Sequence, residues 1–245
     1  MHFAETLLLW YEAHARHLPW RGTGNPYHVW LSEVILQQTR VAQGTSYYFR
    51  FLELFPTIEA LAAAPIDEVM KAWQGLGYYT RARNLHKAAQ VLVAQYGGQL
   101  PADYEALRSL PGLGPYAAGA VASFAFNLPV PAIDGNGYRV LARIFGRFDE
   151  ISQGAGQRAF RELALTEMDR ARPADFNQAL IDFGATQCTP GMPDCTPCPM
   201  CAFCYAYAHE QQLVLPVKAR KIELRKRYFH YLVVLHEAST YLELR

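Results

Sequence analysis

The sequence predicts an all-α protein that ends in a short β-hairpin. Apolar residues recur at helical spacing through most of the 245 residues, and this spacing places them on one face of each helix. Glycine and proline residues divide these stretches into segments of helix length. A strand pattern around a short turn is confined to residues 227–245, and it is typical of two paired strands.

The predicted helices follow one another with short connections. The first lies within residues 1–20, where Leu7, Leu8 and Tyr11 recur at helical spacing. The second begins at Pro26, because proline is favoured in the first turn of a helix. Further helices are expected within residues 65–77, 81–98, 103–110, 115–126, 135–145, 156–168 and 173–187.

Composition and charge narrow the class of protein. No segment reaches the ~18 uninterrupted apolar residues of a membrane helix, and the opening lacks the basic start and the cleavage site of a signal peptide. We therefore expect a cytoplasmic protein without a membrane partner. Residues 218–245 carry a charge of +4 and the preceding residues −3, which gives +1 for the chain. A nucleic acid would be bound by local patches and backbone donors, not by overall charge.

Four cysteines occur close together with a regular spacing. Cys188, Cys195, Cys198 and Cys204 form the pattern C-x6-C-x2-C-x5-C, with Cys201 inside the last interval. A chain without a secretion signal is not expected to form disulfides, so the thiolates suit Zn²⁺ or an iron–sulfur cluster. Zinc sites favour two short C-x2-C pairs, and the longer intervals here favour a [4Fe–4S] cluster. Cys201 is expected to be a bystander.

Residues 103–126 predict two helices joined by the tight turn LPGLG. Gly112 and Gly114 leave backbone N–H groups beside a helix N-terminus, where the helix dipole favours an anion. On DNA, such a unit binds a backbone phosphate and reads no bases. An ordinary turn between two helices is the alternative, and the surrounding motifs decide between the two.

Three motifs occur in the order found in the endonuclease III superfamily of DNA glycosylases: this hairpin, the DGN of residues 134–136 and the cysteine loop. Within that superfamily, residues 30–39 (WLSEVILQQT), 75–85 (GLGYYTRARNL) and 132–136 (AIDGN) resemble the MutY adenine glycosylases. The similarity runs from about residue 17 to about residue 210. It implies the helix-hairpin-helix DNA glycosylase fold with an iron–sulfur cluster loop.

The resemblance also implies a division into domains. A six-helix barrel domain with the hairpin is expected at residues 22–127, and an iron–sulfur cluster domain at residues 1–21 and 128–213. Residues 214–245 would hold a linker and the start of a truncated Nudix-like domain. Because that domain helps the family to recognise 8-oxoguanine, excision is expected to persist here while discrimination weakens.

The function implied by the resemblance is DNA repair. The enzyme would flip adenine out of a mispair with 8-oxoguanine or guanine in double-stranded DNA and hydrolyse its N-glycosidic bond. A monomer is expected, with a [4Fe–4S] cluster and a monovalent cation at the hairpin. Three alternatives stay open: a thymine–guanine mismatch glycosylase, a bifunctional glycosylase like endonuclease III, and a non-catalytic DNA-binding module that carries the cluster.

Two carboxyl groups are the candidate catalytic residues. Glu33 lies in an otherwise apolar helix, and such surroundings raise the pKa of a carboxyl group; by resemblance it protonates the adenine. Asp134 precedes a helix, where its charge is favoured, and it is expected to stay ionised and face the sugar cation. Glycoside hydrolysis likewise uses two carboxyl groups in different environments. Asn136 and Tyr116 are expected to hydrogen-bond these carboxyls or the nucleophile.

Tyr116 also decides what happens to the DNA strand. Bifunctional members of the superfamily carry a lysine at this position, and its amine attacks the sugar C1′ and permits strand cleavage. Tyrosine cannot form an imine. The sequence therefore predicts a monofunctional enzyme that uses water and leaves the strand whole.

Further residues are assigned to the DNA interface by resemblance. Leu18, Arg21 and Trp30 match positions that line the adenine pocket. Gln38 and Tyr78 match residues that wedge into the duplex beside the orphaned base, and stacking on a base contributes roughly 1–3 kcal/mol. The full set expected to contact DNA is Gln38, Thr39, Tyr78, Arg83, Gly112 and Gly114. Arg81, Lys87, Arg139 and Arg143 are candidates for phosphate contacts.

Overall fold

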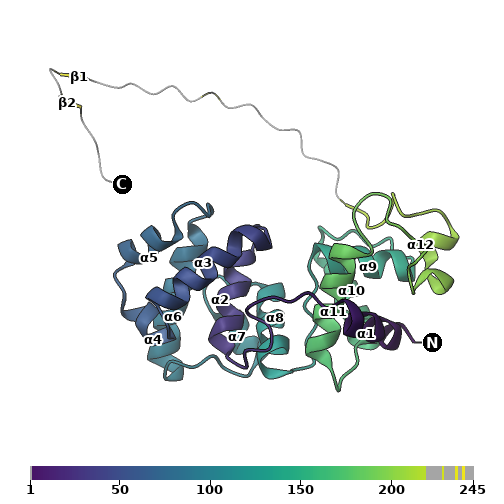
Figure 1. Cartoon of the computed structure of the whole chain (residues 1–245), viewed down its shortest axis with the longest axis horizontal. Coiled ribbons are helices and arrows are strands. Elements are labelled where there is room, and N and C mark those ends of the chain that lie inside the picture. Colours follow the sequence, from purple (N-terminus) through teal and green to yellow (C-terminus); the bar gives the residue numbers. More distant parts are fainter. Residues whose placement is uncertain (1, 219–227, 229–234, 237–238, 241–245) are drawn as a thin grey trace.

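The computed structural model describes residues 2–218, 228, 235–236 and 239–240. Within these residues the fold is helical, as predicted, and Figure 1 shows the helices in two adjacent groups. The first group holds α2 (Pro26–Leu36), α3 (Val41–Leu54), α4 (Ile58–Ala63), α5 (Ile66–Trp73), α6 (Thr80–Tyr96), α7 (Tyr104–Ser109) and α8 (Pro115–Phe126). The second holds α1 (Phe3–His14), α9 (Gly135–Phe145), α10 (Gly154–Glu167), α11 (Pro173–Thr186), the 3₁₀ turn Cys201–Phe203 and α12 (Tyr205–Ala208).

Only four residues of the predicted C-terminal hairpin are described as strands. β1 (Leu235–His236) pairs antiparallel with β2 (Ser239–Thr240), with Leu235 opposite Thr240. Apart from these residues and Tyr228, the segment 227–245 lies outside the described residues, so the longer hairpin stays a prediction. Three helices in the described chain, α3, α4 and the short α12, were not predicted.

The buried side chains form two hydrophobic clusters that match the two groups of helices. The first is built by α2–α8 around Trp30, Phe51 and Trp73. The second is built by α1, α9, α10 and α11, and Trp10 of α1 meets Phe183 of α11 edge to face at 4.9 Å. The N-terminal helix thus packs with the C-terminal half of the chain.

Helix α8 brings the two clusters together because its residues are small. A Cβ at Gly119 would lie 2.5 Å from the carbonyl oxygen of Pro131, so only glycine allows this approach. The segment after α8 therefore runs directly along the helix and delivers Asp134 to the boundary between the clusters. No helix in the described ranges is both long and apolar enough to span a bilayer.

Asn177 of α11 fixes this connecting segment. Its side chain is fully buried, accepts from the Ala132 backbone N–H at 3.0 Å and donates to the Val130 carbonyl at 2.9 Å and the Ser123 hydroxyl at 2.8 Å. Buried backbone groups need such partners because burial without a hydrogen bond is costly. One amide thus joins α11, α8 and the segment that precedes Asp134.

Asn177→Ala should lower the free energy of unfolding by about 3 kcal/mol, because it leaves the Ala132 N–H and the Val130 carbonyl buried without partners. Urea unfolding followed by circular dichroism measures this change. Gln90→Ala, which removes an exposed amide from α6, is the matched control and should change stability little. A loss for Asn177→Ala no larger than that of the control would contradict the assigned role.

Candidate active site

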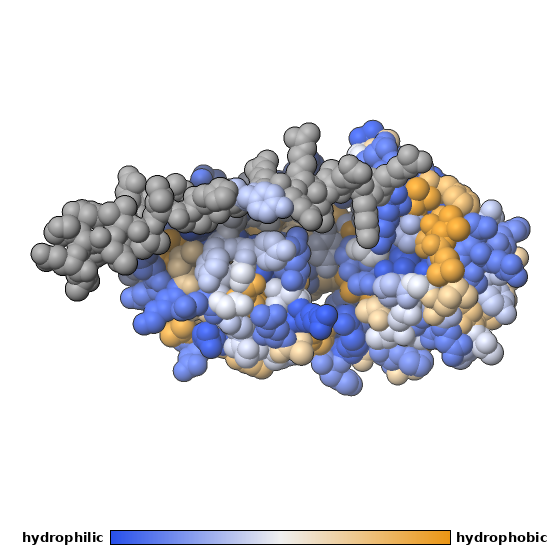
Figure 2. Space-filling model, turned by 90° about the horizontal axis from the view of Figure 1, so that it is seen from above, coloured by the Kyte–Doolittle hydropathy of each residue, from blue (hydrophilic) through white to orange (hydrophobic). Residues whose placement is uncertain are grey.

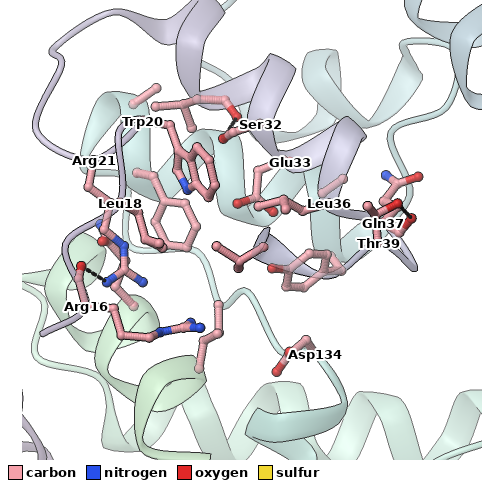
Figure 3. Close-up of a pocket in the computed structure, with 18 of the residues that line it drawn as sticks. Arg16, Leu18, Trp20, Arg21, Ser32, Glu33, Leu36, Gln37, Thr39 and Asp134 are labelled. Atoms are coloured by element: carbon pink, nitrogen blue, oxygen red, sulfur yellow. Dashed lines mark hydrogen bonds between the residues drawn. The ribbon is translucent and has the colours of Figure 1, made fainter. Parts of the chain in front are cut away.

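A cavity of about 970 Å³ opens between the two clusters (Figure 3). Helices α2 and α8, the N-terminus of α9 and one face of α11 form its walls together with residues 16–24. The structure brings most of the predicted site residues to this one cavity, although they come from separate parts of the sequence. They are Leu18, Arg21, Glu33, Gln38, Thr39, Gly112, Gly114, Tyr116, Asp134 and Asn136.

Glu33 points into the cavity from α2. Burial raises the pKa of its carboxyl group to about 7, and the nearby charge of Asp134 adds to this. A hydrogen bond with Tyr116 and the charge of Arg21 act in the opposite direction. At neutral pH the group therefore holds a proton for a large part of the time, and it can donate that proton to a bound molecule.

Asp134 is the N-cap of α9 and lies in a different environment. It accepts from the backbone N–H groups of Asn136 at 2.9 Å and Gly137 at 2.8 Å, and the Asn136 side chain donates to it at 2.8 Å. Burial raises the pKa of Asp134, and these three hydrogen bonds oppose the rise because they favour the charged form. The cavity thus contains a proton donor and a carboxylate held by backbone donors.

Tyr116 lies in the first turn of α8 between these carboxyl groups and lines the cavity. Burial, followed by the charges of Glu33 and Asp134, raises its pKa well above the usual value. The phenol therefore keeps its proton at neutral pH. It interacts with Glu33 as a neutral hydroxyl and offers no amine to the cavity.

Arg21 is held in the wall by a fully buried aspartate. The Arg21 guanidinium binds both carboxylate oxygens of Asp182, at 2.7 and 2.9 Å, and Arg16 donates from its backbone N–H and its Nε to the same group. Burial pushes the pKa of Asp182 up, but the hydrogen bonds from Arg21 and Arg16 outweigh it, and the pKa is lowered. The sequence analysis missed Asp182. The sequence does contain one indication of its role: Asp182 is an acidic residue on the apolar face of a helix, where a buried charge requires a partner.

The prediction for Trp30 is wrong. Its side chain is fully buried in the first cluster and does not line the cavity, and its indole N–H has no hydrogen-bond partner in the described part of the chain. Trp20 lies in the cavity wall instead (Figure 3). On α2 the cavity is lined by Val29, Ser32, Glu33 and Leu36, whereas Trp30 faces away from it.

The predicted wedge residues lie at the surface. Tyr78 is 65% exposed, and Gln38 is exposed at the rim of the cavity.

Gly112 has a φ of +83° at the hairpin, and a Cβ there would lie 2.8 Å from Asn84. Gly114 is the N-cap of α8. Thr39 lies at the cavity, and Arg83 is exposed on α6.

Three of the candidate phosphate-binding arginines are used inside the protein. Arg139 and Arg143 are buried, and they donate to backbone carbonyls at the end of α11 and in the segment that follows it. Arg81 donates to carbonyls of two loops. These three assignments are wrong, because a guanidinium that satisfies internal carbonyls is not available to a phosphate. Lys87 remains exposed.

The four cysteines of the predicted cluster lie in the segment that these arginines hold. Arg143 donates to the Cys188 sulfur at 3.4 Å, and Arg139 donates to the Cys188 carbonyl at 2.8 Å. Burial raises the pKa of Cys195, Cys198 and Cys204, to about 11 for Cys198, and the charge of Cys188 adds to this for each. The four thiols are therefore close enough to influence one another, and all are free.

The donor set fits a cluster better than a single ion. Among the residues that the structure describes, no three His, Cys, Asp or Glu side chains stand close enough to hold one metal ion. A [4Fe–4S] cluster binds one cysteine at each of four irons, and so it suits thiols arranged around a wider space. Four cysteine thiols on one segment supply the donor type and number that such a cluster requires.

Comparisons with known proteins identify the class to which the chain and its fold belong. A family model described as "HhH-GPD superfamily base excision DNA repair protein" matches residues 31–164. A solved structure of a thermostable thymine-DNA glycosylase aligns with a TM-score of 0.77 and 31% identity, over 84% of this chain and 95% of that chain. The class is therefore that of the helix-hairpin-helix base excision repair proteins.

Similar curated proteins narrow the class. The chain is 42% identical over 219 residues to the adenine DNA glycosylase of Mus musculus. The aligned region covers 86% of this chain and 42% of that protein. It is 36% identical over 249 residues to the adenine DNA glycosylase of Buchnera aphidicola subsp. Baizongia pistaciae, over 99% of this chain and 69% of that protein. The chain belongs to the HhH-GPD superfamily and, within it, to the adenine DNA glycosylase family. It spans less than half of the mouse protein's length.

The raised pKa of Glu33 predicts a stability cost that depends on pH. The unfolded carboxyl titrates near 4.5 and the folded one near 7, so between these values the folded state binds more protons and the free energy of unfolding falls as pH rises. Glu33→Gln removes the ionisable group. The variant should therefore be more stable than the wild type at pH 8, by at most about 3 kcal/mol, and differ little at pH 5.

Urea unfolding at the two pH values measures this difference. Glu162→Gln, which changes an exposed glutamate on α10, is the matched control and should show no such pH dependence. A Glu33→Gln variant whose stability parallels that of the wild type from pH 5 to pH 8 would show that Glu33 is not buried in this way.

Proposed function

We propose that this protein excises adenine from double-stranded DNA, opposite 8-oxoguanine or guanine, by hydrolysis of the N-glycosidic bond. The observation that carries the proposal is the pair of carboxyl groups in one cavity, with the pKa of Glu33 near 7 and Asp134 held by three hydrogen bonds. Membership of the adenine DNA glycosylase family supports the choice of adenine.

The geometry supports a division of the chemistry between the two groups. Glu33 donates a proton to a ring nitrogen of the flipped adenine, which makes the base a better leaving group. Asp134 faces the sugar and stabilises the positive charge that develops as the bond breaks. Asn136 holds Asp134 in place through its 2.8 Å side-chain hydrogen bond. Water then adds to the sugar, and Glu33 is positioned to accept its proton.

Tyr116 supports a reaction that ends with an intact strand. The phenol at this position stays protonated, because its pKa is raised, and it cannot form an imine with the sugar. We infer that the product is an abasic site in a continuous strand. A monomeric state is part of the same proposal, as is the division into a barrel domain at residues 22–127, a cluster domain at residues 1–21 and 128–213, and a linker with the start of a further domain at residues 214–245.

The proposed reaction predicts which duplexes react. The protein should release base from A:8-oxoG and A:G duplexes and leave T:G and thymine glycol duplexes unchanged, and the strand should break only after alkali. Glu33→Gln should slow single-turnover release by at least ~10²-fold, because an amide cannot protonate the base. Gel analysis of end-labelled strands, with and without alkali, measures both results.

Glu162→Gln serves again as the control and should retain the wild-type rate. Release of thymine from T:G would favour the thymine–guanine mismatch glycosylase. Strand breaks without alkali would favour a bifunctional enzyme. Binding without any base release would leave only the non-catalytic DNA-binding module.

We further propose that Cys188, Cys195, Cys198 and Cys204 hold a [4Fe–4S] cluster. Four mutually influencing thiols in a segment tied to α9 support this proposal. The bound cluster would stabilise the loop and keep it on α9, since metal binding contributes to folding free energy when ligands come from an otherwise weakly structured segment.

Protein purified without oxygen should contain four irons per chain and show a yellow-brown colour. Cys198→Ser should lose the iron, because it removes one ligand, whereas Cys201→Ser should keep it and acts as the matched control. Metal analysis measures the iron content of each variant, and the visible absorption spectrum measures the colour. One zinc per chain without iron would contradict the proposal.

A further inference from the structure

The side chain of Arg81 joins two loops at the cavity rim. Arg81 lies in the first turn of α6, and its Nη1 donates to the carbonyl oxygens of Val34 at 3.2 Å and Ile35 at 2.8 Å, and also to that of Gln37. Both terminal nitrogens lie 3.2 Å from the Thr39 hydroxyl. These acceptors belong to the C-terminal end of α2 and the loop that follows it.

The same guanidinium reaches the loop before α6. Its Nη2 donates to the carbonyls of Leu76 at 3.3 Å and Gly77 at 3.4 Å. The guanidinium also lies over the ring of Trp73 at 5.0 Å, and the Trp73 indole donates to the Gly77 carbonyl at 3.0 Å. One planar group therefore fixes the separation of two loops that are about forty residues apart in the sequence.

These loops carry two residues with strained backbones. Gln38 has a φ of +56° and Tyr78 a φ of +47°. Positive φ is uncommon for residues other than glycine, and it persists only where the surroundings determine it. Gln38 lies between the Gln37 and Thr39 acceptors, and Tyr78 follows the Gly77 acceptor directly. The two strained residues are therefore direct sequence neighbours of the groups that accept hydrogen bonds from Arg81.

The electrostatics of the site favour an internal role for Arg81. Carbonyls at the end of α2 lack helical partners and carry the negative end of the helix dipole, so they attract a cation. The remaining donor, Nε, is buried without a partner in the described chain. The Arg81 guanidinium also lies over the Tyr78 ring at 5.7 Å. Both of its terminal nitrogens therefore have acceptors within the protein.

We propose that Arg81 is a positioning residue that holds Gln38 and Tyr78 at a fixed separation for insertion into the DNA duplex. The inference rests on the proposed function, since it concerns the step in which the adenine leaves the stack. Arg81 does not touch the base. Lysine cannot replace it, because one nitrogen cannot serve acceptors in both loops.

The test compares Arg81→Lys with the wild type on two substrates. In the first, adenine is paired opposite 8-oxoguanine; in the second, the same adenine lies in an unpaired bubble. Arg81→Lys should slow release from the paired substrate by about tenfold or more, as misplaced positioning groups do, and slow release from the bubble much less. A general structural defect would slow both reactions equally.

Two further measurements isolate the role of positioning. 2-Aminopurine in place of adenine should become fluorescent on binding wild-type protein, as the base leaves the stack, and remain quenched with Arg81→Lys. A Tyr78→Ala, Arg81→Lys double variant should lose less activity than the two single losses combined, since Arg81 acts in part through Tyr78. Arg170→Lys, an exposed arginine outside the cavity, controls for the change of residue type.

The outcomes separate the two proposals. If wild-type protein releases no adenine from A:8-oxoG, the proposed function fails, and the 2-aminopurine signal still reports on Arg81. If the wild type is active and Arg81→Lys slows both substrates equally, or neither, the inference about Arg81 is wrong. Should Arg81→Lys fail to fold, Thr39→Val removes one of the acceptors and enters the same comparison with the same expected pattern.

Discussion

The burial of the Glu33 carboxyl group in the cavity wall is the feature on which the arrangement of the neighbouring residues depends. A carboxyl group keeps its proton near neutral pH only where water and positive charge are kept away. Arg21 lies close enough to lower the pKa of Glu33, but the fully buried Asp182 binds its guanidinium through two hydrogen bonds. This pairing directs the positive charge toward α11. Arg21 can therefore shape the pocket while Glu33 stays a proton donor.

Buried arginines tie the chain together at several points around the cavity. Arg81 joins the loops after α2 and before α6, and Arg143 donates to the carbonyls of Thr189 and Gln212. In each case an arginine satisfies carbonyls that lie in loops or in the last turn of a helix, where helical backbone partners are missing. Some of the arginines that contribute to the net charge of +1 therefore hold the fold together. Hydrophilic residues cover much of the face of the described chain shown in Figure 2, but the net charge is only +1. We therefore expect binding to DNA to depend more on exposed backbone donors, such as those of the hairpin, than on overall charge.

The sequence predicts the helices whose apolar residues are regular and the site residues that belong to long motifs. It does not predict α3, where only Gly44, Tyr48 and Phe51 are buried along fourteen residues, because the apolar face is narrow and aromatic residues also occur on the exposed side. Trp30 was assigned to the cavity from its place in a motif, yet the rotation of α2 turns it into the core. Internal arginine contacts and Asp182 depend on which helices meet, and this information is not local in the sequence.

The geometry also links the cysteine segment to Asp134. The side-chain amide of Asn136 donates to Asp134, and the Oδ1 of the same amide accepts from Arg139 at 2.8 Å. Arg139 donates in turn to the backbone carbonyls of Cys188 and Gly184. A continuous series of hydrogen bonds therefore runs from the first cysteine to Asp134. Because each bond orients the next donor, a displacement of the Cys188 backbone would turn Arg139, release Asn136 and remove one of the three hydrogen bonds that keep Asp134 charged. If Asp134 has the role proposed above, the cysteine segment supports it through the position of one buried guanidinium.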